Sequence, residues 1–298
     1  MPLTSSPAAT SPSILNGGNG EWDVVIRPRG KVVAIDLRSV WNYRDLVWMF
    51  FKRDFITFYK QTILGPLWYL IQPTLTSLTY FVVFGKIANI STNGLPPFLF
   101  YMSGIVMWTY FSACLTNNSE VFSKNASLFG KVYFPRLVVP ISVAMSSFVT
   151  FGIQFALLVV TTLGFSFAGS GVTLHLPVFA LLPLLICYVA ALGMGVGLIV
   201  SALTVRFRDL AYATGFVTQL WMYATPVVYP YSQIPVKYQW FFNLNPMTAP
   251  VETLRSIMFG VEGVGGTVWI SNLVVTVCLL FAGLVLFSRA ESNAMDTV

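Results

Sequence analysis

The chain has 298 residues, of which 56% are hydrophobic and only 9% are charged. Soluble domains carry roughly 25% charged residues, so this composition excludes a soluble enzyme, a nucleic-acid-binding domain and a disordered chain. The net charge of +6 therefore indicates membrane orientation and no nucleic-acid partner. The composition is typical of an integral membrane protein that has the lipid bilayer as its surroundings.

The chain begins with two segments that precede the apolar region. Residues 1–22 are rich in Ser, Pro, Thr, Ala and Gly, and they predict a disordered tail, not a signal peptide. Residues 23–62 are expected to form a cytoplasmic segment. Within it, apolar residues recur at helical spacing opposite a charged arc, which predicts an interfacial amphipathic helix over 41–61. That helix is either a membrane anchor or a functional cuff around the helix bundle.

Long intervals without charged residues mark the membrane-spanning helices. A spanning helix needs about 20 apolar residues, and the interval from Arg136 to Arg206 holds two, divided by the turn-rich segment 164–177. Membrane barrels are excluded because their strands alternate polar and apolar residues. The sequence predicts an all-α membrane domain over 63–288 and a cytoplasmic tail over 289–298. Its six spans are expected near 63–85, 97–119, 138–164, 177–203, 211–229 and 266–288.

Basic residues indicate the orientation of the chain. Of its 17 lysines and arginines, Lys86, Lys237 and Arg255 fall on one side of the predicted spans, and all others fall on the opposite side. Cytoplasmic loops carry the excess of Lys and Arg in membrane proteins, so both termini are expected in the cytoplasm.

Two connections are too apolar for solvated loops. The cytoplasmic loop over 120–140 mixes basic residues with large apolar side chains, which are expected to bury among lipid headgroups or to dock in a partner's groove. The outer connection over 230–266 is broken by prolines and holds a short helix at 247–259, which predicts re-entrant periplasmic half-helices. Glu252 and Arg255 can pair there, as functional charges or as a structural ion pair.

Small residues recur at four-residue spacing in the fourth expected span, at Gly193, Gly197 and Ser201. Such a seam lets two helix backbones approach closely. We expect it to serve packing within the chain.

Motifs for catalysis or for binding a cofactor do not occur in the sequence. Gly130-Lys131 is followed by Val132, so a nucleotide-binding loop is missing, and His175 has no metal-ligating neighbour. The expected spans hold neither paired carboxylates for ion-driven transport nor a nucleophile with a His or Asp partner. We therefore expect no catalytic residue, no metal site and no cofactor in this chain, which is not an enzyme.

Aromatic residues make up 15% of the chain and gather in or near the expected spans. Tyr and Trp concentrate at membrane interfaces, but their rings also stack on sugars, so some could line a glycan path. The candidates for such a channel are Trp68, Tyr69, Trp108, Tyr110, Tyr223 and Tyr229.

Seven motifs follow one another along the chain. They are Lys52-Arg53-Asp54, Phe58–Trp68 with Gln72-Pro73, Ser103-Gly104 with Trp108 and Phe111, Lys131–Arg136, Arg206–Asp209, Thr225–Pro230 and Asn245-Pro246. In this order they resemble the membrane (permease) subunits of bacterial polysaccharide-exporting ABC transporters, the O-antigen, capsule and teichoic-acid export family. The resemblance runs from about Val24 to Arg289.

The resemblance implies a type-2 exporter in the bacterial inner membrane, built as a homodimer with two cytoplasmic ATP-binding subunits that hold ATP and Mg. It implies a channel for undecaprenyl-linked polysaccharide, O-antigen foremost, and hence a part in lipopolysaccharide biosynthesis. By the same resemblance, the residues of the periplasmic gate are Asn245, Pro246, Glu252 and Arg255. Those that couple to the ATPase are Arg53, Asp54, Lys131, Phe134, Pro135, Arg136, Arg206, Arg208 and Asp209.

Two other functions remain open on the sequence alone. An ABC exporter of another cargo, such as capsule, teichoic acid, a small lipid or a drug, would differ only in what it carries. A membrane-embedded transferase would need clustered acid–base residues, and only the segment Arg206–Asp209 approaches that requirement.

Overall fold

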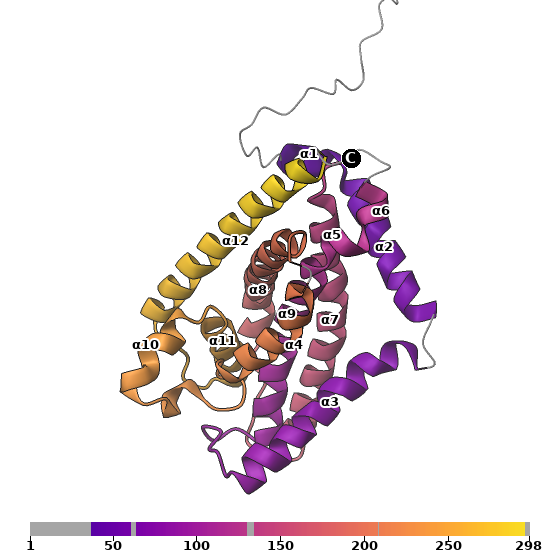
Figure 1. The fold of residues 1–298 in the computed structure, drawn as a ribbon. Helices are drawn as coiled ribbons and strands as arrows, with labels where there is room; N and C mark the ends of the chain where they lie inside the picture. The colour runs from indigo at the N-terminus through magenta and orange to yellow at the C-terminus, as the bar shows by residue number, and fades with distance from the viewer. Residues whose placement is uncertain (1–36, 61–63, 130–133, 208, 296–298) are drawn as a thin grey trace, which may run out of the picture. The chain divides into compact units, whose positions relative to one another are not determined.

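The computed structural model of the chain describes residues 37–60, 64–129, 134–207 and 209–295, and the predicted tail over 1–22 lies outside them. All regular elements in this part of the chain are helices (Figure 1), which confirms the predicted all-α class. The elements are α1 Leu37–Asn42, α2 Arg44–Lys60, η1 Gly65–Leu67, α3 Trp68–Tyr80, η2 Phe81–Ile87, α4 Pro97–Ser119, α5 Val121–Lys124, α6 Ala126–Phe129, α7 Val138–Phe167, α8 Pro177–Thr204, α9 Leu210–Tyr223, η3 Tyr231–Gln233, α10 Val236–Leu244, α11 Thr248–Phe259 and α12 Gly266–Met295.

Four of these helices are long and apolar enough to cross a membrane, namely α4, α7, α8 and α12. All four were expected from the charge-free intervals, and α4 has the predicted bounds of 97–119. Their length follows from the bilayer, because about 20 residues at 1.5 Å each span its hydrocarbon core. The chain is therefore a multi-pass membrane protein.

The first expected span differs from its prediction in where it begins. The helix starts at Trp68 instead of residue 63, because Gly65 has a positive φ of 50° and the chain makes a 3₁₀ turn over Gly65–Leu67. From there α3 continues into the π-helical turn η2 and ends at Ile87. The combined helix has 20 residues, 13 from α3 and 7 from η2.

The fifth expected span is shorter than its prediction. Helix α9 ends at Tyr223, whereas the sequence indicated a helix to residue 229. Pro226 explains the difference, since proline lacks the amide hydrogen of a helix and disfavours helical geometry in the residue before it. Residues 224–230 form a buried irregular segment instead.

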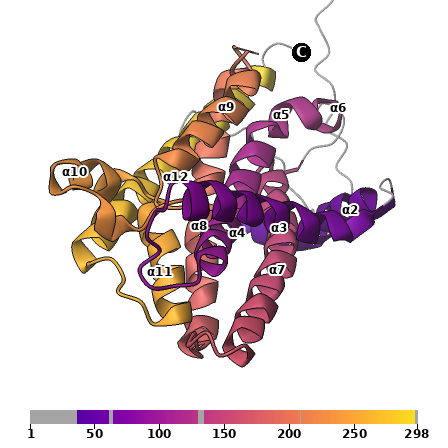
Figure 2. The ribbon, with the colours of Figure 1, turned by 90° about the horizontal axis from the view of Figure 1, so that it is seen from below.

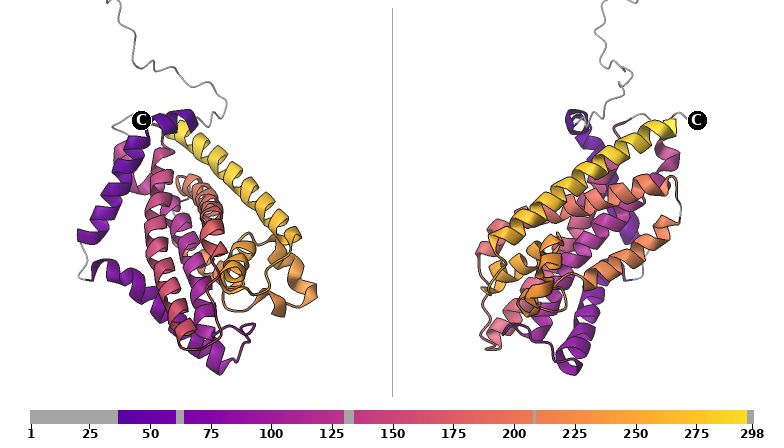
Figure 3. Two further views of the ribbon diagram at one scale, coloured as in Figure 1. Left: turned by 180° about the vertical axis from the view of Figure 1, so that it is seen from behind. Right: turned by 60° about the vertical axis from the view of Figure 1, so that its left-hand side comes forward.

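Helix α8 lies at the centre of the bundle and packs against both α4 and α12, as the right-hand view of Figure 3 shows for α12. A Cβ atom placed on Gly193 would lie 2.6 Å from Cβ of Cys114, and one on Gly197 would lie 2.6 Å from Cβ of Asn118. The predicted small-residue seam is thus confirmed as a packing surface within the chain. On another side of α8, Gly195 faces α12, where an added Cβ would lie 2.7 Å from Cα of Leu280.

The two ends of the bundle differ in the elements that they hold. Helices α1, α5 and α6 lie at one end, together with the C-terminal part of α12 (Figures 1 and 3). The C-terminal part of α8 packs there, through Leu198. We call it the basic end because these elements and the residues next to them include Lys124, Arg136, Arg206 and Arg289. Helices α10 and α11 lie toward the other end. Figure 2 shows α2 and α10 on opposite sides of the bundle, with α3 passing in front of it.

Candidate functional site

A fully buried arginine organises the end of the bundle that holds α11. The guanidinium of Arg255 donates to the carbonyl oxygens of Pro226 at 2.6 Å, Val227 at 2.8 Å and Phe100 at 3.2 Å. It also pairs with Glu252 at 2.9 Å, and its carbon Cζ lies 3.7 Å from the centroid of the Phe100 ring. The side chain is only 1% exposed. One cation therefore joins α4, the segment 224–230 and α11.

Local sequence makes room for this arginine. Gly104 lies beside it on α4, and a Cβ atom there would be 2.7 Å from Nη2 of Arg255. Ser103 accepts a weak hydrogen bond from Nε at 3.4 Å. The Ser103-Gly104 motif and the Thr225–Pro230 motif, which are far apart in the sequence, thus both contact the Arg255 guanidinium.

Asn245 ties the same segment to the start of α11. Its amide nitrogen donates to the carbonyl oxygen of Ala224 at 2.8 Å and to the hydroxyl of Thr225 at 2.9 Å. Its oxygen accepts from the indole nitrogen of Trp221 at 3.0 Å and from the amide of Met247 at 3.1 Å. All hydrogen-bonding capacity of this buried amide is directed at neighbouring backbone and side chains, so the turn after α9 is held rigidly.

Helix α12 is joined to this assembly through a second polar cluster. Asn272 donates to the carbonyl oxygen of Asn243 at 2.6 Å and accepts from the amide of Ala249 at 3.0 Å. The Tyr188 hydroxyl lies 2.9 Å from the carbonyl oxygen of Pro246 and accepts from Thr276 at 2.7 Å. The predicted gate residues are therefore buried within the chain, and their contacts join α11 to the segment 224–230.

The apolar loop at the basic end has a different environment from the one expected. Its aromatic side chains pack within the chain: Phe134 lies 5.8 Å from the Phe50 ring of α2, and Phe122 stacks on Phe287 of α12 at 4.5 Å between ring centroids. The expectation of burial in headgroups or in a partner's groove was wrong for Phe134, which is 5% exposed. Hydrophobic burial instead fixes the loop to α2, α8 and α12.

The predicted ATPase-coupling residues separate into two groups. Phe134 and Arg136 are buried, and the Arg136 guanidinium lies 5.2 Å from the Phe129 ring centroid. Pro135 between them is half-buried. Arg206 and Asp209, in the connection between α8 and α9, are exposed. Lys131 and Arg208 lie outside the described residues, and Arg53 pairs with its neighbour Asp54 at 2.8 Å.

The aromatic channel candidates are also divided by burial. Trp108 and Tyr110 are 6% and 3% exposed, because they pack on the Trp221 and Phe151 rings of their own chain. Neither offers an open face to a passing sugar in this structure, contrary to expectation. Trp68 and Tyr223 are exposed, Tyr229 is partly buried and donates to the Tyr223 carbonyl oxygen at 2.7 Å, and Tyr69 lines a cavity.

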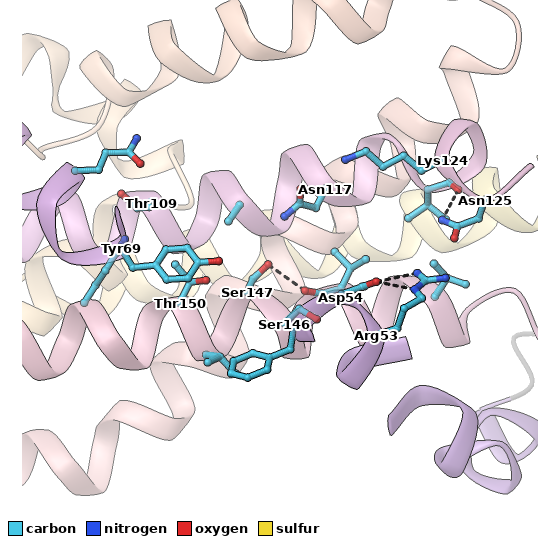
Figure 4. A pocket seen from close by; sticks show the side chains of 18 residues that line it. Arg53, Asp54, Tyr69, Thr109, Asn117, Lys124, Asn125, Ser146, Ser147 and Thr150 are labelled. Atoms are coloured by element: carbon cyan, nitrogen blue, oxygen red, sulfur yellow. Dashed lines mark hydrogen bonds and ion pairs between the residues drawn. The ribbon is translucent and has the colours of Figure 1, made fainter. Parts of the chain in front are cut away.

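That cavity has a volume of about 750 Å³ and lies between α2, α3, α4 and α7. Figure 4 shows Arg53, Asp54 and Lys124 toward one end and Tyr69 and Thr109 toward the other. The amide and hydroxyl groups of Asn117, Ser146, Ser147 and Thr150 lie between them. Sequence analysis missed this site, although polar and small residues at four-residue spacing in the second and third spans signal it.

The fold and these sites can be compared with known proteins. The family model described as ABC-2 type transporter matches residues 45–259. This chain belongs to the ABC-2 type transporter family.

Two relatives of this ABC-2 subunit are similar to it over most of their length. A protein of Myxococcus xanthus is 29% identical over 261 residues, which are 87% of this chain and 97% of the relative. A protein of Klebsiella pneumoniae is 28% identical over 248 residues, 83% of this chain and 92% of the relative. Each relative is named O-antigen export system permease protein RfbA.

Membership of this family confirms the expectation of a transport subunit that is not itself an enzyme. The match covers both the polar hub around Arg255 and the cavity between α2, α3, α4 and α7.

Proposed function

We propose that this ABC-2 subunit forms, with a second copy of itself, the channel through which O-antigen linked to a lipid carrier leaves the cytoplasm. The observation that carries the proposal is its similarity, along 97% of the relative's length, to an O-antigen export permease. Two separate ATP-binding subunits bind the basic end and supply the energy, and these subunits hold the ATP and Mg.

In this proposal the chain crosses the inner membrane six times, with both termini in the cytoplasm. Four helices meet the length for a span by themselves. The continuous α3–η2 helix, 20 residues long from 13 and 7, supports a fifth. Helix α9 provides the sixth together with the buried segment 224–230, and α10 and α11 are re-entrant half-helices on the periplasmic side. The irregular segment 224–230 and helix α11 are largely buried within the chain, as backbone at membrane depth requires.

In this proposal, packing at the basic end couples the chain to ATP hydrolysis. The loop over 120–140 is fixed to α2 through Phe50 and Phe134, and to α12 through Phe122 and Phe287. A partner that pushes on this end therefore moves α2 and α12 together. The exposed connection between α8 and α9 supplies the contact surface, with Arg206 and Phe207 open to a partner.

Deletion of the chain's gene tests the function, with O-antigen at the cell surface as the measurement. Loss of surface polymer, with lipid-linked polymer accumulating inside and rescue by the intact gene, is expected. Unchanged surface O-antigen would contradict the proposal. Loss of capsule, of teichoic acid or of drug resistance instead would assign another cargo.

Replacing Arg206 with glutamate is expected to weaken binding of the ATPase subunits and to reduce export at least tenfold. The side chain is exposed, so charge reversal at a contact changes partner binding and leaves folding intact. Co-purification of the ATPase with the tagged permease measures the effect. Lys237→Glu is the matched control, since Lys237 is exposed on α10 away from the basic end. Equal ATPase recovery with both variants would contradict the contact.

A further inference from the structure

The cavity between α2, α3, α4 and α7 is lined by two facing helix stripes. On α4, Thr109, Ala113 and Asn117 follow at four-residue spacing, so they share one face, and Asn125 at the end of α5 also lines the cavity. On α7, Ser146, Ser147, Thr150 and Gln154 make the opposite wall. Tyr69 and Gln72 of α3 contribute to the lining as well.

Such a concentration of amides and hydroxyls is costly in a membrane-spanning bundle. Polar side chains in spanning helices face the bundle interior or a water-filled path, because lipid cannot satisfy their hydrogen bonds. The hydroxyl of Ser147 is satisfied by its own helix, at 3.0 Å from the carbonyl oxygen of Val143. The amides of Asn117 and Gln154 belong to the cavity lining as well, and each carries both donors and an acceptor.

Gln154 supplies an independent sign of a ligand. Its side chain is 3% exposed and lines the cavity, yet its oxygen Oε1 has no hydrogen-bond partner among the described residues. Leaving a buried polar atom without a partner is unfavourable. A bound group with hydroxyl donors would satisfy it.

The charges around the cavity select the class of ligand. Of the cations in the lining, Arg53 pairs with Asp54 at 2.8 Å and Lys124 pairs with Glu120 at 2.5 Å. A phosphate headgroup would need uncompensated positive charge, which these pairs do not offer. A neutral sugar needs amide and hydroxyl partners and aromatic side chains, and Tyr69 is an aromatic residue of this lining. The volume of about 750 Å³ lies within the range of small-molecule sites.

We propose that this cavity binds a neutral carbohydrate segment of the exported polymer within each subunit, with Asn117, Thr150 and Gln154 as its hydrogen-bonding wall. The inference rests on the proposed function and assigns a sugar site inside one subunit. Because the cavity is bounded by α2 and α3, a bound sugar would also contact the elements that join the basic end to the bundle.

Photo-crosslinking in membranes that contain the intact transporter tests the site. A photoreactive phenylalanine analogue in place of Thr150 is expected to form adducts that contain O-antigen sugars. The same analogue in place of Thr161 is the control. Thr161 lies 11 residues further along α7, outside the cavity lining, and is expected to give none. Cells that cannot synthesise the polymer provide the blank.

The outcomes separate the two proposals. Adducts of sugar at position 150 and not at 161 support the site. Adducts with phospholipid alone, or no adduct while deletion of the gene still stops export, would overturn the sugar site and leave the proposed function standing. Unchanged O-antigen export after deletion would overturn both.

Replacing Gln154 with methionine provides a second test. A purely structural role of Gln154 would leave the yield of sugar adducts unchanged. The substitution keeps the shape and removes the unpartnered polar atom, so thermal stability of the purified chain is expected to be equal or higher. The yield of sugar adducts is expected to fall about fivefold, the equivalent of one hydrogen bond of about 1 kcal/mol. Gln239→Met on α10 is the matched control. Unchanged yield, or a fall in stability, would overturn the role of Gln154.

Discussion

Replacing Arg255 with alanine is expected to lower the free energy of unfolding by about 3–5 kcal/mol and to abolish export. The substitution leaves the Glu252 carboxylate buried at 4% exposure without its cation. It also removes the donors to the carbonyl oxygens of Pro226, Val227 and Phe100. A buried charge and several buried carbonyl groups would lose their partners together, which explains the size of the effect.

The melting temperature of the purified chain in detergent measures this prediction. Arg206→Ala is the control, because Arg206 is exposed at the other end of α8 and its removal costs little. Arg255→Lys tests the geometry. Lysine keeps the charge but lacks the planar fork that reaches three carbonyl groups and a carboxylate, so it is expected to recover only a part of the stability. Equal melting temperatures of Arg255→Ala and Arg206→Ala would contradict the stabilising role of Arg255.

Replacing Gly283 with valine is expected to separate α8 from α12 and to destabilise the chain by about 3 kcal/mol, the upper range for overpacking. A Cβ atom at position 283 would overlap the carbonyl oxygen of Gly195. The carbonyl oxygen belongs to the backbone of α8, and the position of the added Cβ atom is set by the backbone of α12. Neither can move aside as the end of a flexible side chain would. The helices would have to part along their contact, which also carries the bond between Thr276 and Tyr188.

Abundance in membranes and thermal unfolding in detergent measure the effect of Gly283→Val. Gly152→Val on α7 is the matched control, since nothing lies within 4 Å of a Cβ atom at that position. Both variants carry the same helix-propensity change, so the difference between them isolates the close approach of α8 and α12. Equal stability of the two variants would show that the contact is not tight in solution.

The sequence determined by itself where most helices lie. Intervals without charge predicted the first residues of α4, α7, α8 and α12 to within a few residues of the observed ones. They do so because a bilayer imposes length and apolarity on every span. Motif order also identified the family that the comparisons support. The end of α9 was missed although Pro226 signals it. What the local pattern did not show is that an arginine 29 residues away satisfies the buried carbonyl group of Pro226.

Tertiary structure alone decided what the polar and aromatic side chains do. From the sequence, Glu252 and Arg255 were equally a gate charge or an ion pair, and Trp108 was a candidate for a channel wall. Packing places the pair and the tryptophan inside one subunit. The apolar loop at the basic end found its partner in its own chain, through Phe50 and Phe134. Burial and hydrogen bonding depend on which distant segments pack together, and the residue pattern of one segment does not predict its neighbours in space.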